Sequence, residues 1–494
     1  MASIQLEEIT IGQVHAAYKE GRVTAEALTA AFLDRIQKID KAADGPKLNS
    51  TLAINGSALE EAKRLDTAFA KDGRFVGPLH GIPVVVKDHL KTKGMPNTYG
   101  SVVAKDYIPD EDATAVVKLK SAGVIILAKT TMPDWGTDWF SNSSLSGRTR
   151  NPYDLSRDPG GSSGGTAVAL AANLAVVGLG SDTGGSSRVP AAFCSLVGFR
   201  PTSGLISGYG GLRAVNGQST VGPMARTVTD LALLLDAVAG YDENDSVTAI
   251  HARALDMPRG GSYASEFDTH SPQRVGVIRA MFGEDTIPEQ RQVNEVIQAS
   301  LNTLSKCGVT LVDIKVPNLA NYISGSSVLL TRSRIDLEGF IKENFGVDFS
   351  SLLANGQLPK ENVMVAYALP RVAASPYESG GYGKQLDTRA EFDAVLSGLM
   401  IKHRISAFAF PEAKIPPPVS TDIDAKMRLA VPANFAIASN LRWPAISVPA
   451  GFTASGLPVG LELLSLPLKD QELLNLAYRV EQAVQGRKPP TSLS

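Results

Sequence analysis

Cysteine is nearly absent from this sequence. The 494 residues contain two, Cys194 and Cys307, so a disulfide scaffold is excluded and buried free thiols in a reducing compartment are expected. The six histidines are scattered, and neither an HExxH nor a CxxC pattern occurs. Because these patterns are typical of zinc sites, we expect no metal.

The sequence also lacks an excess of one charge and any long apolar run. The formal net charge is −2 and no basic run stands out, which argues against a nucleic-acid partner. No stretch of about 18 apolar residues could span a membrane, and the first residues lack the basic and apolar regions of a signal peptide. We therefore expect a cytoplasmic protein that binds neither nucleic acid nor membrane.

What is present is a regular alternation of helix and strand patterns. Residues 57–73 have charges and apolar residues at helical spacing, whereas Ile82–Val86 and Val124–Ala128 are short apolar runs rich in β-branched residues. The same alternation continues to a last helical segment that ends near residue 484. This order predicts the α/β class, with a sheet that helices cover on both faces.

No linker rich in Ser, Gly or Pro divides the chain, so we expect residues 1–494 to form a single domain. Two segments within it have weak periodicity. Residues 242–268 are predicted to be a loop. Residues 318–384, the least regular segment, are predicted to be a variable insertion that faces the substrate.

A Gly-Gly-Ser-Ser block occurs twice, at Gly160–Ser163 and at Gly184–Ser187. Serine is a poor nucleophile until a base takes its proton, and no histidine lies near either block in the sequence. Lys87 directly follows the strand Ile82–Val86. A lysine buried at the carboxyl edge of a sheet can act as a base, because burial disfavours its ammonium form. The common alternative is a lysine that leaves the strand into solvent.

The second block offers consecutive backbone N–H groups from Thr183 to Ser186, just before Pro190, which suits the first turn of a helix. Glycines let several N–H groups point at one spot, as an oxyanion requires. A structural turn that cradles an anion fits the same residues equally well. No Gly-Lys-Ser/Thr follows the glycines, which excludes a P-loop.

Three blocks, in this order, resemble the amidase signature family: GPLHGIPVVVKDHL, DPGGSSGGTAVALAANL and GSDTGGSSRVPAAFCSLVGFRPT. The resemblance runs from about Ile11 to Glu481 and is weakest in the middle third. The layout is most similar to stand-alone bacterial amidases of the peptide-amidase type. The resemblance implies a large mixed central β-sheet covered by helices on both faces. It also implies hydrolysis of an amide C–N bond through an acyl-enzyme, with no metal and no organic cofactor.

The family uses a Ser–cis-Ser–Lys triad. Carried over by motif, this makes Ser186 the nucleophile, Ser162 the relay that follows a cis peptide bond, and Lys87 the base. The resemblance also implies an oxyanion hole formed by Thr183, Gly184, Gly185 and Ser186. It further implies residues that hold the loops without taking part in the chemistry: Ser163, Asp182 and Arg188.

The sequence departs from the family pattern close to these residues. Ser187 stands where most members have a branched apolar residue, Ser195 replaces a glycine after Cys194, and Ser219 replaces an aspartate. No triad residue is lost. The departures weaken any transfer of substrate preference from the family.

Two other functions remain open. Gly161–Gly165 fits the G-x-S-x-G elbow of α/β-hydrolases, which would make Ser163 the nucleophile. Its base would then be one of the histidines His251, His270 and His403. The resemblance also extends to amidotransferase subunits that release ammonia from glutamine inside a complex, so a partner protein is a second alternative.

Substrate contacts are predicted in the segment after Thr130: Trp135, Gly136, Thr137, Trp139 and Phe140. For any one of these aromatic residues a place in the core is as good an interpretation. Arg442 and Trp443 are expected to approach from the C-terminal side. The predicted partners are a small amide substrate and water, with a homodimer as the one assembly considered. Esters and carbamates have the same carbonyl geometry and stay open as substrates.

Overall fold

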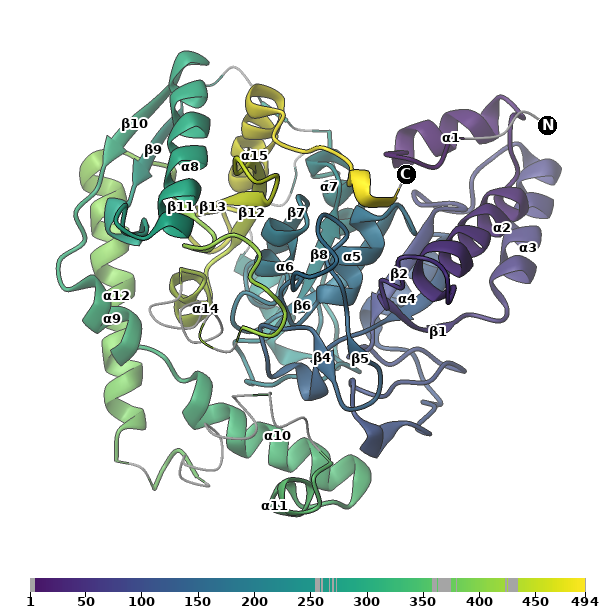
Figure 1. The fold of residues 1–494 in the computed structure, drawn as a ribbon, viewed down its shortest axis with the longest axis horizontal. Helices are drawn as coiled ribbons and strands as arrows, with labels where there is room; N and C mark the ends of the chain where they lie inside the picture. The colour runs from purple at the N-terminus through teal and green to yellow at the C-terminus, as the bar shows by residue number, and fades with distance from the viewer. Residues whose placement is uncertain are drawn as a thin grey trace.

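One mixed sheet of eleven strands runs through the protein (Figure 1). The computed structural model describes residues 5–253, 258, 261–265, 267–268, 271, 273–357, 362, 375–378, 380–422, 424 and 434–493. The strand order is β1-β3-β2-β6-β8-β7-β12-β13-β11-β9-β10. The strands are β1 (Thr51–Ile54), β2 (Pro83–Lys87), β3 (Ile125–Thr130), β6 (Val177–Asp182), β7 (Val197–Arg200), β8 (Thr220–Ala225), β9 (Gln273–Val277), β10 (Val309–Asp313), β11 (Ala407–Pro411), β12 (Ala445–Phe452) and β13 (Pro458–Leu464). A separate small hairpin joins β4 (Asn142–Ser143) to β5 (Gly147–Arg148).

Helices cover both faces of this sheet, as predicted. They are α1 (Ile11–Lys19), α2 (Ala25–Arg35), α3 (Ala58–Asp72), α4 (Thr114–Ser121), α5 (Gly164–Ala171), α6 (Arg188–Phe193), α7 (Val228–Val238), α8 (Pro288–Lys306), α9 (Leu319–Gly325), α10 (Leu329–Phe345), α11 (Phe349–Ala354), α12 (Tyr382–His403), α14 (Ala436–Leu441) and α15 (Asp470–Val484). The short α5 and α6 contact each other and the central strands, whereas α7 and α8 each pack against α15. None of the helices in the described ranges is long and apolar enough to cross a bilayer.

The three strands β3, β2 and β6 determine where the candidate site lies. Both β3 and β6 run parallel to β2, in register Lys87↔Thr130 and Val86↔Leu179. Parallel strands bring their carboxyl ends to one edge of the sheet. Lys87 and Asp182 are the last residues of β2 and β6, so the expected base and the start of the second Gly-Ser block meet at this edge.

The described parts of the two weakly periodic segments are more regular than expected. Residues 246–253 form a short 3₁₀ helix inside the predicted loop. Residues 318–384 contain α9, α10, α11 and the start of α12, so much of the described part of this segment is helical although its sequence pattern is weak. In Figure 1, α9 and α12 lie at the left edge of the molecule and α10 and α11 along the bottom. Their apolar residues pack in clusters separate from the main core. The rest of both segments lies outside the described residues.

Candidate active site

Lys87 is a fully buried lysine whose amino group contacts three serine hydroxyls. Its Nζ lies 2.6 Å from Ser162 Oγ, 3.1 Å from Ser163 Oγ and 2.8 Å from Ser181 Oγ. No carboxylate among the described residues lies within ion-pair distance of it. Burial lowers the pKa of Lys87 to about 7, and the Asp182 carboxylate only partly opposes this shift. A substantial fraction of Lys87 is therefore neutral near pH 7, as a general base requires.

The first Gly-Ser block brings two of these hydroxyls to Lys87. The peptide bond between Gly161 and Ser162 is cis, as the resemblance implied, and α5 begins two residues later. Ser163 precedes this helix, and its hydroxyl contacts the backbone of Ser181 in β6. A Cβ on Gly180 would lie 2.6 Å from Ser163 Oγ, so glycine at this strand position allows the close approach of the block to the sheet.

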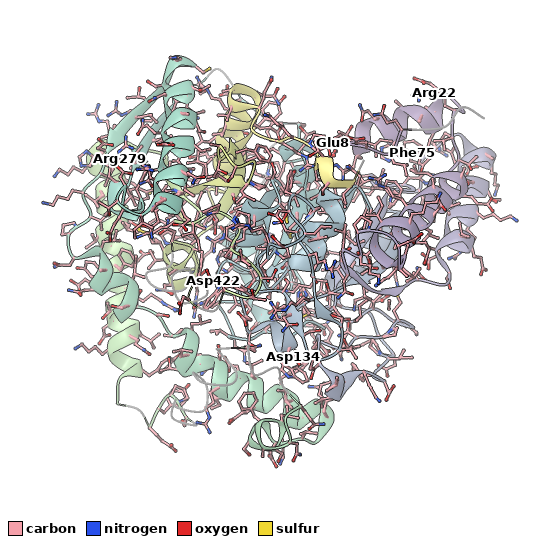
Figure 2. The ribbon with its side chains drawn as sticks, viewed as in Figure 1. Glu8, Arg22, Phe75, Asp134, Arg279 and Asp422 are labelled. Atoms are coloured by element: carbon pink, nitrogen blue, oxygen red, sulfur yellow. The ribbon has the colours of Figure 1, made fainter. Side chains whose placement is uncertain are left out.

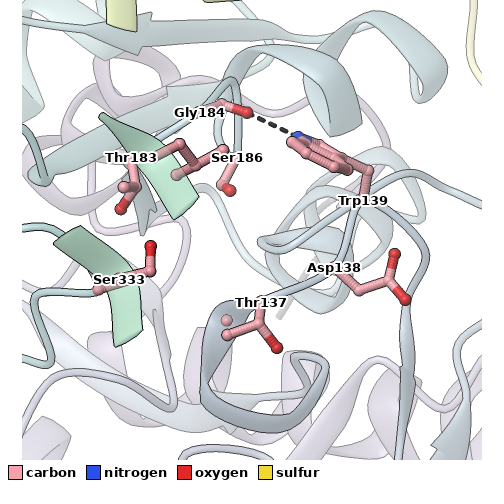
Figure 3. Close-up of a pocket in the computed structure, with 10 residues that line it drawn as sticks. Thr137, Asp138, Trp139, Thr183, Gly184, Ser186 and Ser333 are labelled. Atoms are coloured by element: carbon pink, nitrogen blue, oxygen red, sulfur yellow. Dashed lines mark hydrogen bonds between the residues drawn. The ribbon is translucent and has the colours of Figure 1, made fainter. Parts of the chain in front are cut away.

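Ser186 lies in the loop between β6 and α6, and its side chain borders a narrow pocket. The pocket has a volume of about 30 Å³, room for roughly one or two waters. Figure 3 shows Ser186, Thr183 and Trp139 around this space, with the hydrogen bond of 2.7 Å from Trp139 Nε1 to the Gly184 carbonyl. Ser186 Oγ makes no hydrogen bond to any described residue. Its backbone carbonyl accepts a hydrogen bond of 3.0 Å from the Ser163 N–H, which joins the two Gly-Ser blocks.

The predicted oxyanion loop has three backbone N–H groups without a partner among the described residues: those of Thr183, Gly184 and Ser186. The Gly185 N–H differs, since it donates to Asp182 Oδ1 at 3.0 Å. The Gly185 N–H therefore fixes the loop to Asp182 in this structure. Of the four N–H groups expected in the oxyanion hole, the other three remain available to a substrate oxygen. Their role in catalysis stays a prediction.

Asp182 anchors the loop, together with two buried arginines. Its carboxylate accepts hydrogen bonds from Arg188 and Arg200 and from the N–H and hydroxyl of Ser187. Burial opposes ionisation of Asp182, but the two guanidinium groups outweigh it and hold the pKa of the carboxyl well below its usual range. Ser187, a departure from the family pattern, thus gains a defined role as a donor to this carboxylate.

Two further buried carboxyl groups complete this charge network. Arg188 Nη1 lies 2.7 Å from Glu462 Oε1 and 3.9 Å from Glu412 Oε1. Burial and the neighbouring Glu462 raise the pKa of Glu412 well above its usual range. Burial also raises the pKa of Glu462, and the positive charge of Arg188 opposes this shift. Sequence reasoning missed the two glutamates, because they lie beside β11 and on β13, more than 200 residues after the loop.

The segment after Thr130 divides between pocket and core. Gly136, Thr137 and Trp139 line the pocket beside Ser186, and their contact with a substrate stays a prediction. Trp135 and Phe140 do not line this pocket: Trp135 is fully buried and stacks on Tyr99, and Phe140 lies in a separate apolar cluster. The structure therefore corrects these two substrate contacts, since a left-handed turn at Trp135 directs that ring into the core.

Three more residues of the site were not expected from the sequence. Ser181 contacts Lys87 from the neighbouring strand, and the alternation along β6 was the available signal. Leu329 and Ser333 of α10 line the pocket with Ser186, and Figure 3 shows Ser333 facing Thr183. The same picture shows the Asp138 carboxylate directed away from Ser186.

The histidines expected for an α/β-hydrolase site do not reach Ser163 in the described part of the chain. His251 Nε2 bonds to the Leu205 carbonyl at 2.9 Å, and His403 ends α12. His270 lies outside the described residues. The strand before α5 is the two-residue β5, which ends at Arg148, so a strand does not lead directly into Ser163 as the elbow requires.

Comparison with known proteins points to one family. The family model described as Amidase matches residues 27–474. The chain is 34% identical to a glutamyl-tRNA(Gln) amidotransferase subunit from Methanosarcina barkeri, over 98% of each chain. It also resembles the native peptide amidase from Stenotrophomonas maltophilia, with a TM-score of 0.84 and 29% identity over 99% of each chain. An amidase family protein from Bacillus anthracis has a TM-score of 0.82 and 28% identity, over 98% of this chain and 93% of that one. The chain belongs to the amidase family.

Proposed function

We propose that this protein hydrolyses an amide C–N bond with Ser186 as nucleophile, Ser162 as proton relay and Lys87 as base. The observation that carries the proposal is the buried contact of 2.6 Å between Lys87 Nζ and Ser162 Oγ, with no carboxylate among the described residues within ion-pair distance of Lys87. A lysine with a pKa of about 7 needs no histidine to activate a serine.

The reaction proceeds in two steps, acylation of Ser186 and hydrolysis of the acyl-enzyme, which use the same proton relay. Neutral Lys87 takes the proton of Ser162 Oγ, Ser162 takes that of Ser186, and Ser186 Oγ bonds to the substrate carbonyl carbon. The free N–H groups of the loop stabilise the negative oxygen. Ser162 then returns a proton to the substrate nitrogen, the C–N bond breaks and the amine leaves. Water attacks the resulting ester by the same relay and releases the acid.

A fluorophosphonate probe tests the proposal, because it forms a covalent adduct only with an activated serine. We expect an adduct on Ser186, located by peptide mass spectrometry. It should be absent in Ser186→Ala, reduced at least a hundredfold in rate in Lys87→Met, and retained in Ser163→Ala. An adduct on Ser163 that is indifferent to Lys87→Met would overturn the assignment and favour the elbow mechanism.

A glutaminase subunit of an amidotransferase is the second candidate. It is favoured by the similarity to the Methanosarcina barkeri subunit over 98% of both chains. Hydrolysis of simple amides by the purified chain supports a stand-alone amidase. An adduct on Ser186 without turnover of any amide, glutamine included, would favour a subunit that needs its partner.

A further inference from the structure

Two arginines near the catalytic loop have no anionic partner in the described structure. Arg389 lies on α12 and Arg442 directly follows α14, and these two helices pack side by side (Figure 1). Neither guanidinium forms an ion pair with a described carboxylate. Burial, together with the nearby positive charge of Arg442, lowers the pKa of Arg389 to about 10. Arg389 is half-buried and Arg442 is exposed, so two neighbouring positive charges lie without a counter-charge among the described residues.

Arg389 has buried donors that nothing satisfies. Its Nη2 donates to Gln218 Oε1 at 3.0 Å, whereas Nε and Nη1 are buried without a partner among the described residues. Buried polar groups are nearly always hydrogen-bonded, and an exception calls for a ligand or a functional reason. Asp393, one helical turn after Arg389, accepts a hydrogen bond of 2.7 Å from Trp443 Nε1. Asp336, which accepts from the Asn216 N–H, is paired with Arg332 at 2.6 Å.

Arg442 occupies a backbone conformation that favours glycine. Its φ is 62°, at the C-terminal end of α14, where glycine is the usual residue. Its guanidinium lies over the turn that carries Gln218: a Cβ on Gly217 would be 3.3 Å from Arg442 Nη2. Both arginines therefore converge on the Gly217–Gln218 turn from two different helices.

This turn connects the arginines to the catalytic loop and to a large cavity. Gln218 Nε2 donates to the Thr183 carbonyl at 2.9 Å. Gln218 also lines a cavity of about 470 Å³ that shares Trp139, Gly184 and Leu329 with the narrow pocket at Ser186. The narrow pocket has room for the scissile amide group only. The rest of a substrate would extend through the cavity, whose described lining is uncharged, towards Gln218.

We propose that Arg389 and Arg442 form a carboxylate-binding subsite, so that the preferred substrates are amides with a carboxylate at the end remote from the scissile bond. This inference rests on the proposed amidase function and adds its substrate class. A carboxylate can accept from the free donors of Arg389 and from Arg442 at once, and charge-assisted bonds of this kind are the strong ones. The two guanidinium groups then gain the counter-charge that the described residues do not supply.

A pair of substrates of equal length tests the inference. Hexanamide and the monoamide of adipic acid differ in one end group, methyl against carboxylate. We expect the wild-type protein to hydrolyse the carboxylate-bearing amide with a kcat/KM at least tenfold higher, mainly through a lower KM. In Arg389→Gln and Arg442→Gln this ratio should fall about tenfold towards unity.

The matched control is Arg404→Gln. Arg404 is also an arginine that follows a helix with positive φ, at the end of α12, and like Arg442 it is exposed. Its loss removes the same charge from the molecule and should leave the ratio unchanged. A ratio near unity in the wild type, or an equal fall in Arg404→Gln, would overturn the subsite. If Arg389→Gln lowers kcat equally for both amides, Arg389 only positions Gln218 and the subsite is refuted.

Binding without turnover separates this inference from the proposed mechanism. In Ser186→Ala, calorimetry with the adipic monoamide should give a Kd at least tenfold lower than with hexanamide, and the difference should vanish in Ser186→Ala/Arg442→Gln. Equal affinities for the two amides would refute the subsite while leaving the fluorophosphonate result intact. Conversely, failure of fluorophosphonate labelling would refute the mechanism and leave the binding difference as a separate observation.

Discussion

Lys87 and Lys129 are buried lysines in adjacent strands with opposite surroundings. Lys129 lies on β3, forms an ion pair of 3.2 Å with Asp88 and donates to the Leu90 carbonyl and Asn97 Oδ1. Lys87 has three hydroxyls instead, which can accept from an ammonium group or donate to a neutral amine. Burial lowers the pKa of both lysines, but at Lys129 the ion pair with Asp88 opposes the shift, whereas Lys87 has no carboxylate within ion-pair distance among the described residues.

The titration of Lys87 predicts the pH dependence of the nucleophile. Since its pKa is lowered to about 7, the neutral base accumulates as pH rises through that value. The rate of Ser186 labelling by a fluorophosphonate should rise about tenfold per unit below pH 7 and level off above it. Mass spectrometry of the adduct between pH 5 and 9 measures this. A flat profile in the wild type would contradict it, and Lys87→Met should lack the rising limb at its much lower rate.

At the scale of elements, the loop between β6 and α6 is fixed by packing as well as by charge. Gly185 has a φ of 84° and a Cβ there would lie 2.6 Å from Phe435. Phe435 precedes α14 and packs against Trp139. The loop is thus fixed by hydrogen bonds to Asp182 and by contact with the rings of Phe435 and Trp139.

Gly185→Ala is therefore expected to displace the loop and lower kcat/KM by about a hundredfold, since a shift near 1 Å has effects of that size. Kinetics with a neutral amide measure this. Gly147→Ala is the control, because Gly147 has a similar φ of 72° but nothing within 4 Å of its added Cβ. It should keep full activity. Partial recovery in Gly185→Ala/Phe435→Leu would identify the clash as the cause, whereas wild-type kinetics in Gly185→Ala would show that the loop tolerates the methyl group.

The same scale shows what could and could not be predicted from sequence. The strands β2, β3 and β6 are short apolar runs, and their pattern sufficed to predict Lys87 at the sheet edge. Helix α10 was not predicted, because its apolar residues recur only weakly at helical spacing. They pack against Trp135 and its neighbours in a small cluster separate from the main core. Trp135 itself could not be assigned from sequence, since one left-handed residue decides whether the ring faces the pocket or the core.

At the scale of the whole molecule, one ion pair joins the N-terminal segment to the C-terminal segment. Arg487, after the last long helix, donates to both carboxylate oxygens of Glu8, with distances of 2.6 and 2.7 Å. It also donates to the Ser195 carbonyl, behind the catalytic loop. Figure 2 shows Glu8 beside the C-terminal segment. Both residues lie outside the range 27–474 that the family model matches.

Glu8→Gln should therefore destabilise the protein although it lies far from Lys87. The side chain of Arg487 is 12% exposed and that of Glu8 33%, so we expect a cost of about 1–2 kcal/mol, between the values for exposed and buried pairs. Thermal unfolding at pH 7 measures the loss. The adjacent Glu7 is exposed, and Glu7→Gln should leave the midpoint unchanged.

The pH dependence of this difference follows from the sign of the shift. Burial opposes ionisation of Glu8, but the hydrogen bond and charge of Arg487 outweigh it and hold the pKa of Glu8 below its ordinary value of 4.5. The folded state therefore binds the proton less readily than the unfolded chain, so the stabilisation is complete well above pH 4.5 and is lost as pH falls through the folded pKa. The midpoints of wild type and Glu8→Gln should converge as pH is lowered from 6 to 3. Equal midpoints at pH 7, or a difference between the midpoints that grows towards pH 3, would show that the Glu8–Arg487 ion pair does not stabilise the protein.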